Sequence, residues 1–352
     1  MTILVTGAAG FIGSNFVLNW LHSEGEDVVS LDNLTYAGNL DNLSSLLKNT
    51  RHFFVKGDIG DSELVSSVLK KYKPRVILNF AAESHVDRSI SEPGTFIQTN
   101  ILGTYKLLQN TLLYWESLVG KQKKDFRFVH ISTDEVYGDL DIKAPPFTEE
   151  NRYIPNSPYS ASKAASDHLV RAWHQTYKLP VITTNCSNNY GPFQFPEKLI
   201  PLCIINAIND KPLPLYGDGE QIRDWLYVDD HCDAIRLVIK NGLVGETYNI
   251  GGNTERTNIQ VVELVCKLLD ELKPRLNNDS YVKQISFVKD RKGHDRRYAI
   301  DSSKIQKELG WKPEETFESG MTKTIKWYLS HDAWIKNIIS GDYKKWADKH
   351  YS

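Results

Sequence analysis

The sequence predicts an α/β fold, in which a doubly wound parallel sheet is followed by a smaller α/β lobe at the C-terminal end. Three observations support this prediction. Short apolar, β-branched runs alternate with helix-like segments through the first half of the chain, which is typical of a parallel sheet with helices on both faces. A glycine-rich turn joins the first strand to the first helix, and the regular alternation ends near residue 190.

The elements of the first half follow from their residue patterns. Each expected strand is a nearly continuous apolar run, as in a strand buried on both faces. Each expected helix carries apolar residues at helical spacing. Strands are expected at 2–7, 27–32, 52–58, 76–82, 126–133 and 180–188, and helices at 13–23, 61–72, 100–118 and 159–177.

The second half is organised differently, because prolines interrupt it and its expected helices and strands do not alternate regularly. We therefore predict a first domain over residues 1–189 and a second lobe mainly over 190–352. A later segment, such as 225–252, is expected to return to the first domain. The prolines that mark the change are Pro192, Pro196, Pro201, Pro212 and Pro214.

Composition narrows the classes of function. The chain has 352 residues and a net charge of -2, so no overall positive charge favours nucleic acid or an anionic membrane. Four cysteines lie far apart without metal-ligand spacing, which predicts reduced thiols, no metal site and a cytoplasmic location. No apolar run is long enough to span a membrane, and no signal peptide is expected.

The first turn has the pattern of a dinucleotide site. Gly7, Gly10 and Gly13 lie where a strand ends and a helix begins, so the backbone can approach a pyrophosphate at the helix N-terminus. Asp32 follows Gly13 by 19 residues at the end of the second strand, where a carboxylate binds the adenosine ribose and repels a 2′-phosphate. This favours NAD over NADP, although an ordinary strand–helix turn is the alternative.

A tyrosine and a lysine share one face of the helix expected at 159–177. Ser157 is the expected cap and Pro158 lies in the first turn. Tyr159 and Lys163 are four residues apart and therefore about 6 Å apart along the axis. A lysine ammonium beside a phenol lowers the pKa of the tyrosine, which would make Tyr159 a base for a substrate hydroxyl.

Two adjacent carboxyls follow the fifth strand. The stretch HISTDEVYG (130–138) places Asp134 and Glu135 beside the hydroxyl of Thr133. Neighbouring carboxyls push their pKa values apart, so one can serve as an acid while the other serves as a base. The alternative is that the pair only caps a turn.

Several short motifs, each different from the others, follow one another along nearly the whole chain. They are TGAAGFIGSN (6–15), GDI (57–59), AAESHVDRS (81–89), TDEVYG (133–138), PYSASKA (158–164), NNYGPFQFPEKLIP (188–201), PLPLYGDGEQIRDWLYVDDH (212–231), YNIGG (248–252) and DRKGHDRRYAID (290–301). Together they resemble the extended short-chain dehydrogenase/reductase family, and more narrowly its nucleotide-sugar dehydratases. The resemblance implies a Rossmann-type NAD-binding domain and a lyase that eliminates water from dTDP-glucose.

The resemblance also implies a role for each catalytic candidate. Tyr159, assisted by Lys163, takes the proton of the 4-hydroxyl during oxidation at C4. Glu135 then removes the proton at C5, and Asp134 protonates the departing 6-hydroxyl. Thr133 holds the 4-hydroxyl, and hydride returns to C6, which gives a 4-keto-6-deoxy sugar and regenerates NAD.

The remaining contacts come from the same resemblance. The cofactor is expected to contact the turn residues Gly7, Gly10, Phe11, Ile12 and Gly13, then Asp32, Asn33, Leu34, Thr35, Asp58, Ile59, Ala81, Ala82, Ser84, Thr99, Tyr159, Lys163 and Asn189. The substrate is expected to contact Ser84, His85, Thr133, Asn188, Lys198, Leu199, Pro214, Tyr216, Arg223, Asn258, Arg291 and His294.

Several of these residues have structural alternatives. Ile59 could simply pack, Thr99 could cap a helix, and Asn188 with Asn189 could form a turn. His85 and Asp87 could be an active-site pair or a structural one. Each of the expected cations Lys198, Arg223, Arg291 and His294 could be only a surface charge.

Three functional alternatives remain at this stage. A UDP-hexose epimerase would not need the carboxyl pair, and a UDP- or GDP-hexose dehydratase would differ in its nucleotide. A non-catalytic NAD-sensing regulator would be expected to have lost one of the catalytic residues. The surplus apolar side chains of 100–118 suit either a subunit interface or extra core packing. The resemblance implies a homodimer, formed by this helix and the helix at 159–177 of each subunit.

Overall fold

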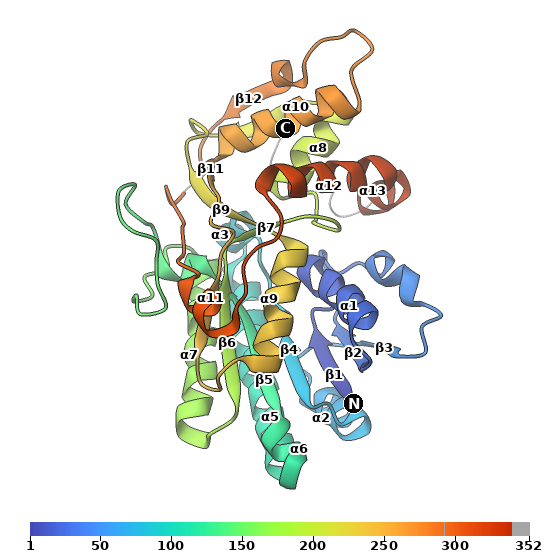
Figure 1. The fold of residues 1–352 in the computed structure, drawn as a ribbon, viewed down its shortest axis with the longest axis vertical. Helices are drawn as coiled ribbons and strands as arrows, with labels where there is room; N and C mark the ends of the chain where they lie inside the picture. The colour runs from blue at the N-terminus through green and yellow to red at the C-terminus, as the bar shows by residue number, and fades with distance from the viewer. Residues whose placement is uncertain (292, 340–352) are drawn as a thin grey trace.

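The computed structural model describes residues 1–291 and 293–339, and over them the larger lobe is built on a seven-stranded sheet (Figure 1). Every neighbouring pair in this sheet is parallel. The order is β10-β6-β5-β4-β1-β2-β3, so the chain reverses direction across the sheet between β1 and β4. The strands are β1 (Thr2–Thr6), β2 (Asp27–Asp32), β3 (His52–Lys56), β4 (Val76–Asn79), β5 (Arg127–Thr133), β6 (Val181–Cys186) and β10 (Thr247–Ile250).

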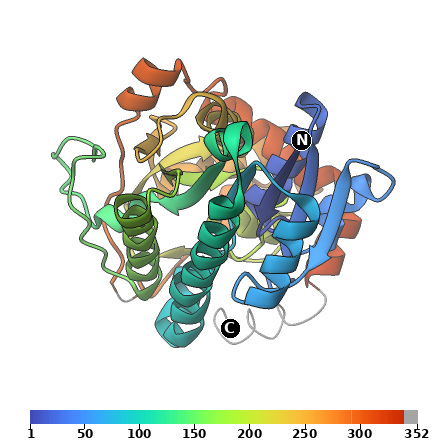
Figure 2. The same ribbon diagram turned by 90° about the horizontal axis from the view of Figure 1, so that it is seen from below.

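Helices cover both faces of this sheet (Figure 2). One apolar core joins the sheet to α1 and α9 through residues such as Phe16, Trp20 and Val238. A second core on the other face includes Leu108 and Val170. The sheet is therefore doubly wound, as the sequence predicts. The covering helices are α1 (Phe11–Ser23), α9 (Val228–Asn241) and α11 (Ser303–Leu309) on the first face, and α2 (Ser62–Tyr72), α5 (Thr104–Ser117) and α7 (Pro158–Tyr177) on the second.

The smaller lobe has a core of its own and two small sheets. One sheet has the order β11 (Glu255–Thr257), β9 (Ile222–Tyr227), β7 (Asn188–Tyr190), and the other pairs β12 (Ile285–Val288) with β8 (Leu213–Tyr216). Its helices are α8 (Leu199–Ile208), α10 (Asn258–Leu272), α12 (Phe317–Ser330) and α13 (Asp332–Ile339). The short helices of the molecule are η1 (Leu40–Leu46), α3 (Val86–Ser91), α4 (Pro93–Phe96), α6 (Gly120–Asp125), η3 (Asp134–Tyr137) and η4 (Tyr281–Gln284).

Three of the expected segments differ from the structure as follows. The strand expected over 180–188 ends at Cys186, and Asn188 already belongs to β7 in the other lobe. The helix expected at 100–118 continues from a π-helix, η2 (Ile97–Gly103). The segment 225–252 returns only in part, since its last strand joins the large sheet while 225–227 stay in β9. The domain boundaries themselves stay a prediction.

The described residues contain neither a membrane-spanning helix nor a metal-binding cluster. None of their helices is both long enough and apolar enough to cross a bilayer. Within the same residues, no group of three or more His, Cys, Asp or Glu side chains is placed to hold a metal ion.

Candidate active site

The two adjacent carboxyls lie at the carboxyl end of β5, next to the reversal of strand order. Thr133 ends the strand and its Oγ1 accepts a hydrogen bond from the backbone N–H of Glu135 at 3.3 Å. This contact caps the short helix η3 and fixes the direction of both acidic side chains. In open parallel sheets, ligands bind at this edge, close to the switch point.

Asp134 is the more deeply buried of the two carboxyls, with 2% of its surface exposed. Its Oδ1 accepts a hydrogen bond from Thr133 Oγ1 at 3.4 Å, while its Oδ2 has no partner among the described residues. Burial raises the pKa of Asp134 well above its usual value, and the negative charges of Glu135 and Asp224 raise it further. Asp134 is therefore suited to carry a proton at neutral pH.

Glu135 lies in a different electrostatic environment. Burial raises the pKa of Glu135 above its usual value, while the positive charges of Arg291, Lys198 and Arg223 oppose that rise. Cations that face one carboxyl more than its neighbour favour ionisation of that carboxyl. The arrangement can therefore provide an acid at Asp134 and a base at Glu135.

Tyr159 and Lys163 lie in the first turns of α7, next to the carboxyls. Ser157 caps this helix, accepting the N–H of Ser160 at 3.0 Å, and Pro158 is its first residue, as predicted. Tyr159 is 8% exposed and Lys163 is 4% exposed. The Nζ of Lys163 donates to the backbone carbonyl of Ile131 in β5 at 2.8 Å. That bond ties the helix to the strand that carries the acid pair.

The predicted lowering of the Tyr159 pKa by Lys163 does not prevail in this structure. Burial raises the pKa of Tyr159 well above its usual value, and the charge of Glu135 raises it further. A hydrogen bond with Thr133 lowers it only in part. Burial also lowers the pKa of Lys163, and Asp167 opposes that change.

The sequence-based search missed the group that supports Lys163. Asp167 lies one helical turn further along α7, is buried, and accepts a hydrogen bond from Ser132 Oγ at 2.7 Å. Its Oδ1 lies 3.2 Å from Nε2 of His130. The signal was present, since Asp167 follows Lys163 by four residues on the same helix face. Asp224 was missed as well, although it is an acidic residue within the apolar run of β9.

The glycine-rich turn brings three segments of backbone into contact. Gly7 has φ +63°, and a Cβ there would lie 2.7 Å from the backbone nitrogen of Ala81. A Cβ on Gly13 would lie 2.2 Å from the carbonyl oxygen of Gly7. Gly10 caps α1 without a side-chain hydrogen bond, and no acidic residue lies in the first turn formed by Phe11, Ile12 and Gly13. Within the described structure, these first-turn N–H groups suit a pyrophosphate.

Asp32 fixes the next loop beside this turn. Its Oδ2 accepts the N–H of Ala9 at 2.8 Å, and its Oδ1 accepts the N–H of Leu34 at 2.8 Å. The side chain of Asn33 donates to Asp58 Oδ2 at 3.0 Å, which links the ends of β2 and β3. The predicted adenosine contacts Asp32, Asn33, Leu34, Thr35 and Asp58 therefore lie around one edge of the sheet.

Four other predicted cofactor contacts lie in three different surroundings. Ala81 and Ala82 follow β4 and are partly buried, with Ala81 against Gly7. Ile59 is buried and packs on Gly103, as the structural alternative expects. Thr99 lies inside η2, so the helix-cap alternative is wrong.

Asn188 and Asn189 lie in strand β7, so the turn alternative is wrong for both. The side chain of Asn189 donates to Ser187 O at 2.9 Å, and its Oδ1 lies 2.9 Å from Nδ1 of His231. The Oδ1 of Asn188 is buried and has no hydrogen-bond partner among the described residues. An unpaired buried acceptor of this kind is suited to a ligand donor.

The predicted substrate residues of the smaller lobe come from several elements, and three of them, Lys198, Arg223 and Arg291, act electrostatically on Glu135. Lys198 donates to Ser84 O at 3.0 Å, and Arg291 lies 3.6 Å from Asp87. Arg223 is 5% exposed, so the surface-charge alternative is wrong for it. The other members of the set are Leu199 at the start of α8, Pro214 and Tyr216 in β8, and Asn258 at the start of α10.

His294 lies beside the carboxylate of Asp290, and His85 lies beside that of Glu197. His294 was expected to act as a cation, but burial and Arg291 lower its pKa to about 4, so it is neutral at physiological pH. His85 contacts the backbone N–H of Arg88 at 3.3 Å and lies 4.0 Å from Glu197, while Asp87 contacts Tyr216 and Arg291.

Comparison with known proteins gives a consistent set of similarities. The family model described as GDP-mannose 4,6-dehydratase matches residues 4–324. A dTDP-glucose 4,6-dehydratase of Xanthomonas campestris is 60% identical over 343 residues, which are 97% of each chain. A Bacillus anthracis dTDP-glucose 4,6-dehydratase, solved in complex with NAD, gives a TM-score of 0.85 at 48% identity, covering 96% of this chain and 99% of that chain. The UDP-glucose 4-epimerase of Thermotoga maritima, solved with UDP-glucose, gives 0.81 at 30% identity, covering 94% and 99%.

Proposed function

Because the chain belongs to the family described as GDP-mannose 4,6-dehydratase, we propose that its site catalyses one particular dehydration, that of dTDP-glucose to the 4-keto-6-deoxy sugar. The enzyme is an NAD-dependent hydro-lyase. The observation that carries the proposal is the unequal pair at the end of β5, where Asp134 is buried with one unpartnered oxygen and Glu135 faces three cations. An epimerase needs no such pair, and the solved epimerase is also the more distant relative in sequence.

The residues of the chain divide the proton transfers among them. Tyr159, hydrogen-bonded to Thr133, is placed to take the proton of the 4-hydroxyl as C4 is oxidised, which requires positive charge in the complex to offset the burial that raises its pKa. The ketone at C4 acidifies the hydrogen at C5, which Glu135 removes. Asp134 then protonates the 6-hydroxyl as it leaves as water. NAD supplies a reversible hydride acceptor when bound, so the net reaction needs no added reductant.

Backbone N–H groups and a carboxylate would hold the cofactor, whereas positively charged side chains would hold the diphosphate of the substrate. The uncapped N–H groups of the glycine-rich turn and the fixed carboxylate of Asp32 suit NAD. Arg223, Arg291 and Lys198 supply positive charge for the substrate diphosphate. The neutral His294 would act there as a hydrogen-bonding group.

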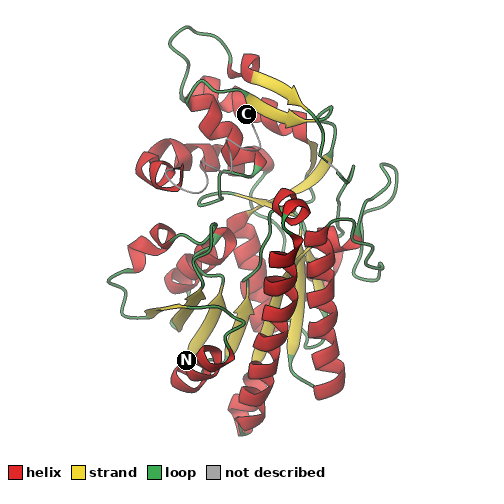
Figure 3. Ribbon diagram, turned by 180° about the vertical axis from the view of Figure 1, so that it is seen from behind, coloured by secondary structure: helices red, strands yellow, loops and turns green. Residues whose placement is uncertain are grey.

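The proposal includes a homodimer. Figure 3 shows α5 and α7 side by side on one face of the sheet, and Tyr105 packs against Trp173 between them. Leu108 and Leu112 cover the sheet, whereas Ile97, Leu102 and Leu113 are exposed. Burying these exposed side chains against a second copy would remove apolar surface from water. We expect Leu102→Asp to give monomers in light scattering, while Leu276→Asp, at an exposed site of the smaller lobe, leaves the dimer intact.

The cytoplasmic location also stays part of the proposal. All four cysteines are buried and free, which suits a reducing compartment.

The reaction is tested by incubating the purified protein with dTDP-glucose, UDP-glucose or GDP-mannose and no added reductant. Nuclear magnetic resonance should show the 4-keto-6-deoxy sugar from dTDP-glucose, without net formation of NADH. Turnover of a UDP- or GDP-sugar alone would contradict the proposed substrate. Conversion of none of them, with NAD still bound, would favour a non-catalytic NAD-sensing regulator.

A further inference from the structure

The helix α13 connects the smaller lobe to the cofactor half of the molecule. Its residue Trp334 is 6% exposed and sits among aromatic rings of its own lobe. The ring centroid of Trp334 lies 4.9 Å from that of Trp327 and 6.1 Å from those of Tyr328 and Phe193. These contacts fix the direction in which the indole N–H points.

The indole N–H of Trp334 forms a hydrogen bond with a residue of the larger lobe. It donates to Oδ1 of Asn42 at 2.7 Å, a contact between residues 292 positions apart. The Nδ2 of Asn42 in turn donates to the carbonyl oxygen of Ala9 at 2.9 Å. Asn42 is 3% exposed, so its amide forms a buried bridge from Trp334 to Ala9.

Ala9 lies between Gly7 and Gly10 in the glycine-rich turn. Its N–H donates to Asp32, as described above, and its carbonyl oxygen also accepts the N–H of Asn39 at 3.0 Å. The orientation of the Ala9 peptide therefore depends on the contacts of Asp32, Asn39 and Asn42. These contacts fix the backbone that would meet the pyrophosphate.

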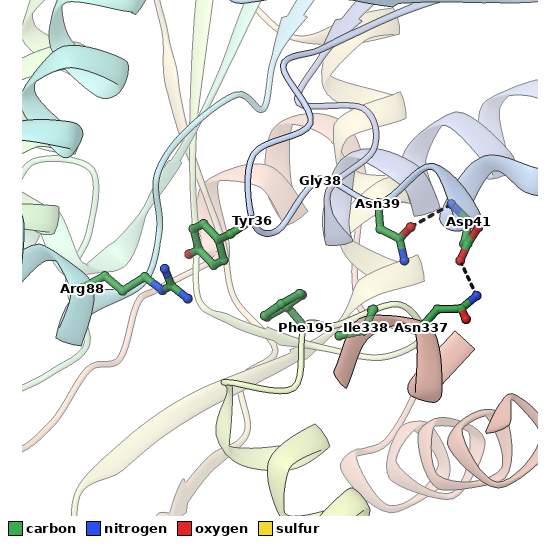
Figure 4. Close-up of a pocket in the computed structure, with 8 residues that line it drawn as sticks. All are labelled: Tyr36, Gly38, Asn39, Asp41, Arg88, Phe195, Asn337 and Ile338. Carbon is green, nitrogen blue, oxygen red and sulfur yellow. Dashed lines mark hydrogen bonds between the residues drawn. The ribbon is translucent and has the colours of Figure 1, made fainter. Parts of the chain in front are cut away.

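A second contact of α13 lies close by (Figure 4). Asn337 donates to Oδ2 of Asp41 at 3.0 Å, and the N–H of Asp41 donates to the side chain of Asn39 at 3.0 Å. A pocket of about 350 Å³ separates this contact from Tyr36 and Arg88 on its far side. The loop that follows Asp32 is thus held by the smaller lobe at its outer edge.

We propose that Trp334 and Asn42 are positioning residues that lock the glycine-rich turn in its phosphate-binding shape and thereby slow the release of NAD. The inference rests on the proposed function, since it assumes that NAD binds at this turn. Without the indole N–H, Oδ1 of Asn42 would be left buried and unpaired, and its amide would turn away from Ala9 to find a donor. Slow release suits a cofactor that is regenerated in each catalytic cycle, because it does not need to leave the enzyme between turnovers.

The test compares Trp334→Phe with Trp327→Phe. Both variants lose an indole from the same aromatic cluster. Among the described residues, Trp334 donates a hydrogen bond to Asn42, whereas the indole of Trp327 donates none towards the turn. The measurement is the rate at which NAD leaves the holoenzyme after dilution. We expect release to be about ten-fold faster from Trp334→Phe, the size expected for one lost buried hydrogen bond. Trp327→Phe should release NAD at the wild-type rate.

A second single variant, Asn42→Ala, keeps the test decisive if Trp334→Phe folds poorly. Asn42→Ala should speed release at least as much, and adding Trp334→Phe to it should cause no further change. Equal release rates for Trp334→Phe and Trp327→Phe, or additive effects of Trp334→Phe and Asn42→Ala, would overturn the proposal. A wild-type protein that binds no NAD would instead contradict the proposed function.

Discussion

The predicted cofactor site at the glycine-rich turn and the predicted acid–base site at the end of β5 depend on different physical properties. At the turn, Gly7 and Gly13 matter through the side chains that they lack, because backbone atoms occupy the space where a Cβ would lie. At the end of β5, Asp134 and Glu135 are chemically alike. They differ only through burial and the charges that face them, since Asp224 acts on one and Arg291 on the other.

The difference shows which kind of site tolerates change. A site made by backbone shape fails when a single atom is added, whereas a site made by electrostatic environment shifts gradually as its neighbours change. Substitutions at the two sites separate these two behaviours.

The largest effect is expected at the turn. Gly13→Ala would place a Cβ 2.2 Å from Gly7 O, a clash that only a backbone movement can relieve, so NAD binding should be lost. Gly25→Ala is the control and should bind NAD normally, because a Cβ there would meet no atom within 4 Å and the residue lies outside the turn. Calorimetric titration with NAD measures both. Tight binding by Gly13→Ala would mean that the backbone contact does not shape the site.

A smaller and graded effect is expected from the charge that faces Glu135. Arg291 lowers the pKa of Glu135, so Arg291→Met should raise it. A base works only when ionised, so the acidic limb of the kcat profile at saturating substrate should move to higher pH. The control is Arg296→Met, because Arg296 pairs instead with Asp218 at 2.9 Å. An unmoved acidic limb in Arg291→Met would show that another group sets it.

The smallest effect is expected for Asp134→Asn, on the free energy of unfolding. The folded-state pKa of Asp134 lies above its unfolded value, so its contribution to stability is full below the unfolded pKa and is lost as pH rises through the folded pKa. Asp134→Asn keeps the shape without that loss, and should raise the free energy of unfolding at pH 8 by about 0.5–2 kcal/mol relative to wild type. Urea unfolding at pH 5 and pH 8 measures the difference. A variant less stable than wild type at both values would contradict this explanation.

The same contrast explains what could be predicted from sequence. The strand–helix alternation, the capped start of α7 and the glycine turn depend on residues close together in the chain, and the structure confirms them. The charge states depend on contacts between distant segments. The neutral His294 and the raised pKa of Tyr159 follow from burial that no local pattern reveals.

Bridges between the lobes are equally hidden from sequence. Nothing in the stretch around Asn42 indicates a partner 292 residues away, and Trp334 resembles any other apolar residue of an amphipathic helix. Asp167 is an intermediate case. Its helical spacing from Lys163 could have been noticed, but its contacts with His130 and Ser132 require the packing of α7 on β5.

The most direct test of the central claim asks whether the two neighbouring carboxyls have opposite roles. Asp134→Asn and Glu135→Gln are each incubated with dTDP-glucose in deuterated water, and deuterium at C5 of the recovered sugar is measured by nuclear magnetic resonance. Glu135→Gln should slow product formation by roughly 100- to 10,000-fold and leave C5 unlabelled. Asp134→Asn should lose water slowly yet still exchange C5, because Glu135 remains ionised. Labelling of C5 by Glu135→Gln but not by Asp134→Asn would contradict the assignment of acid and base.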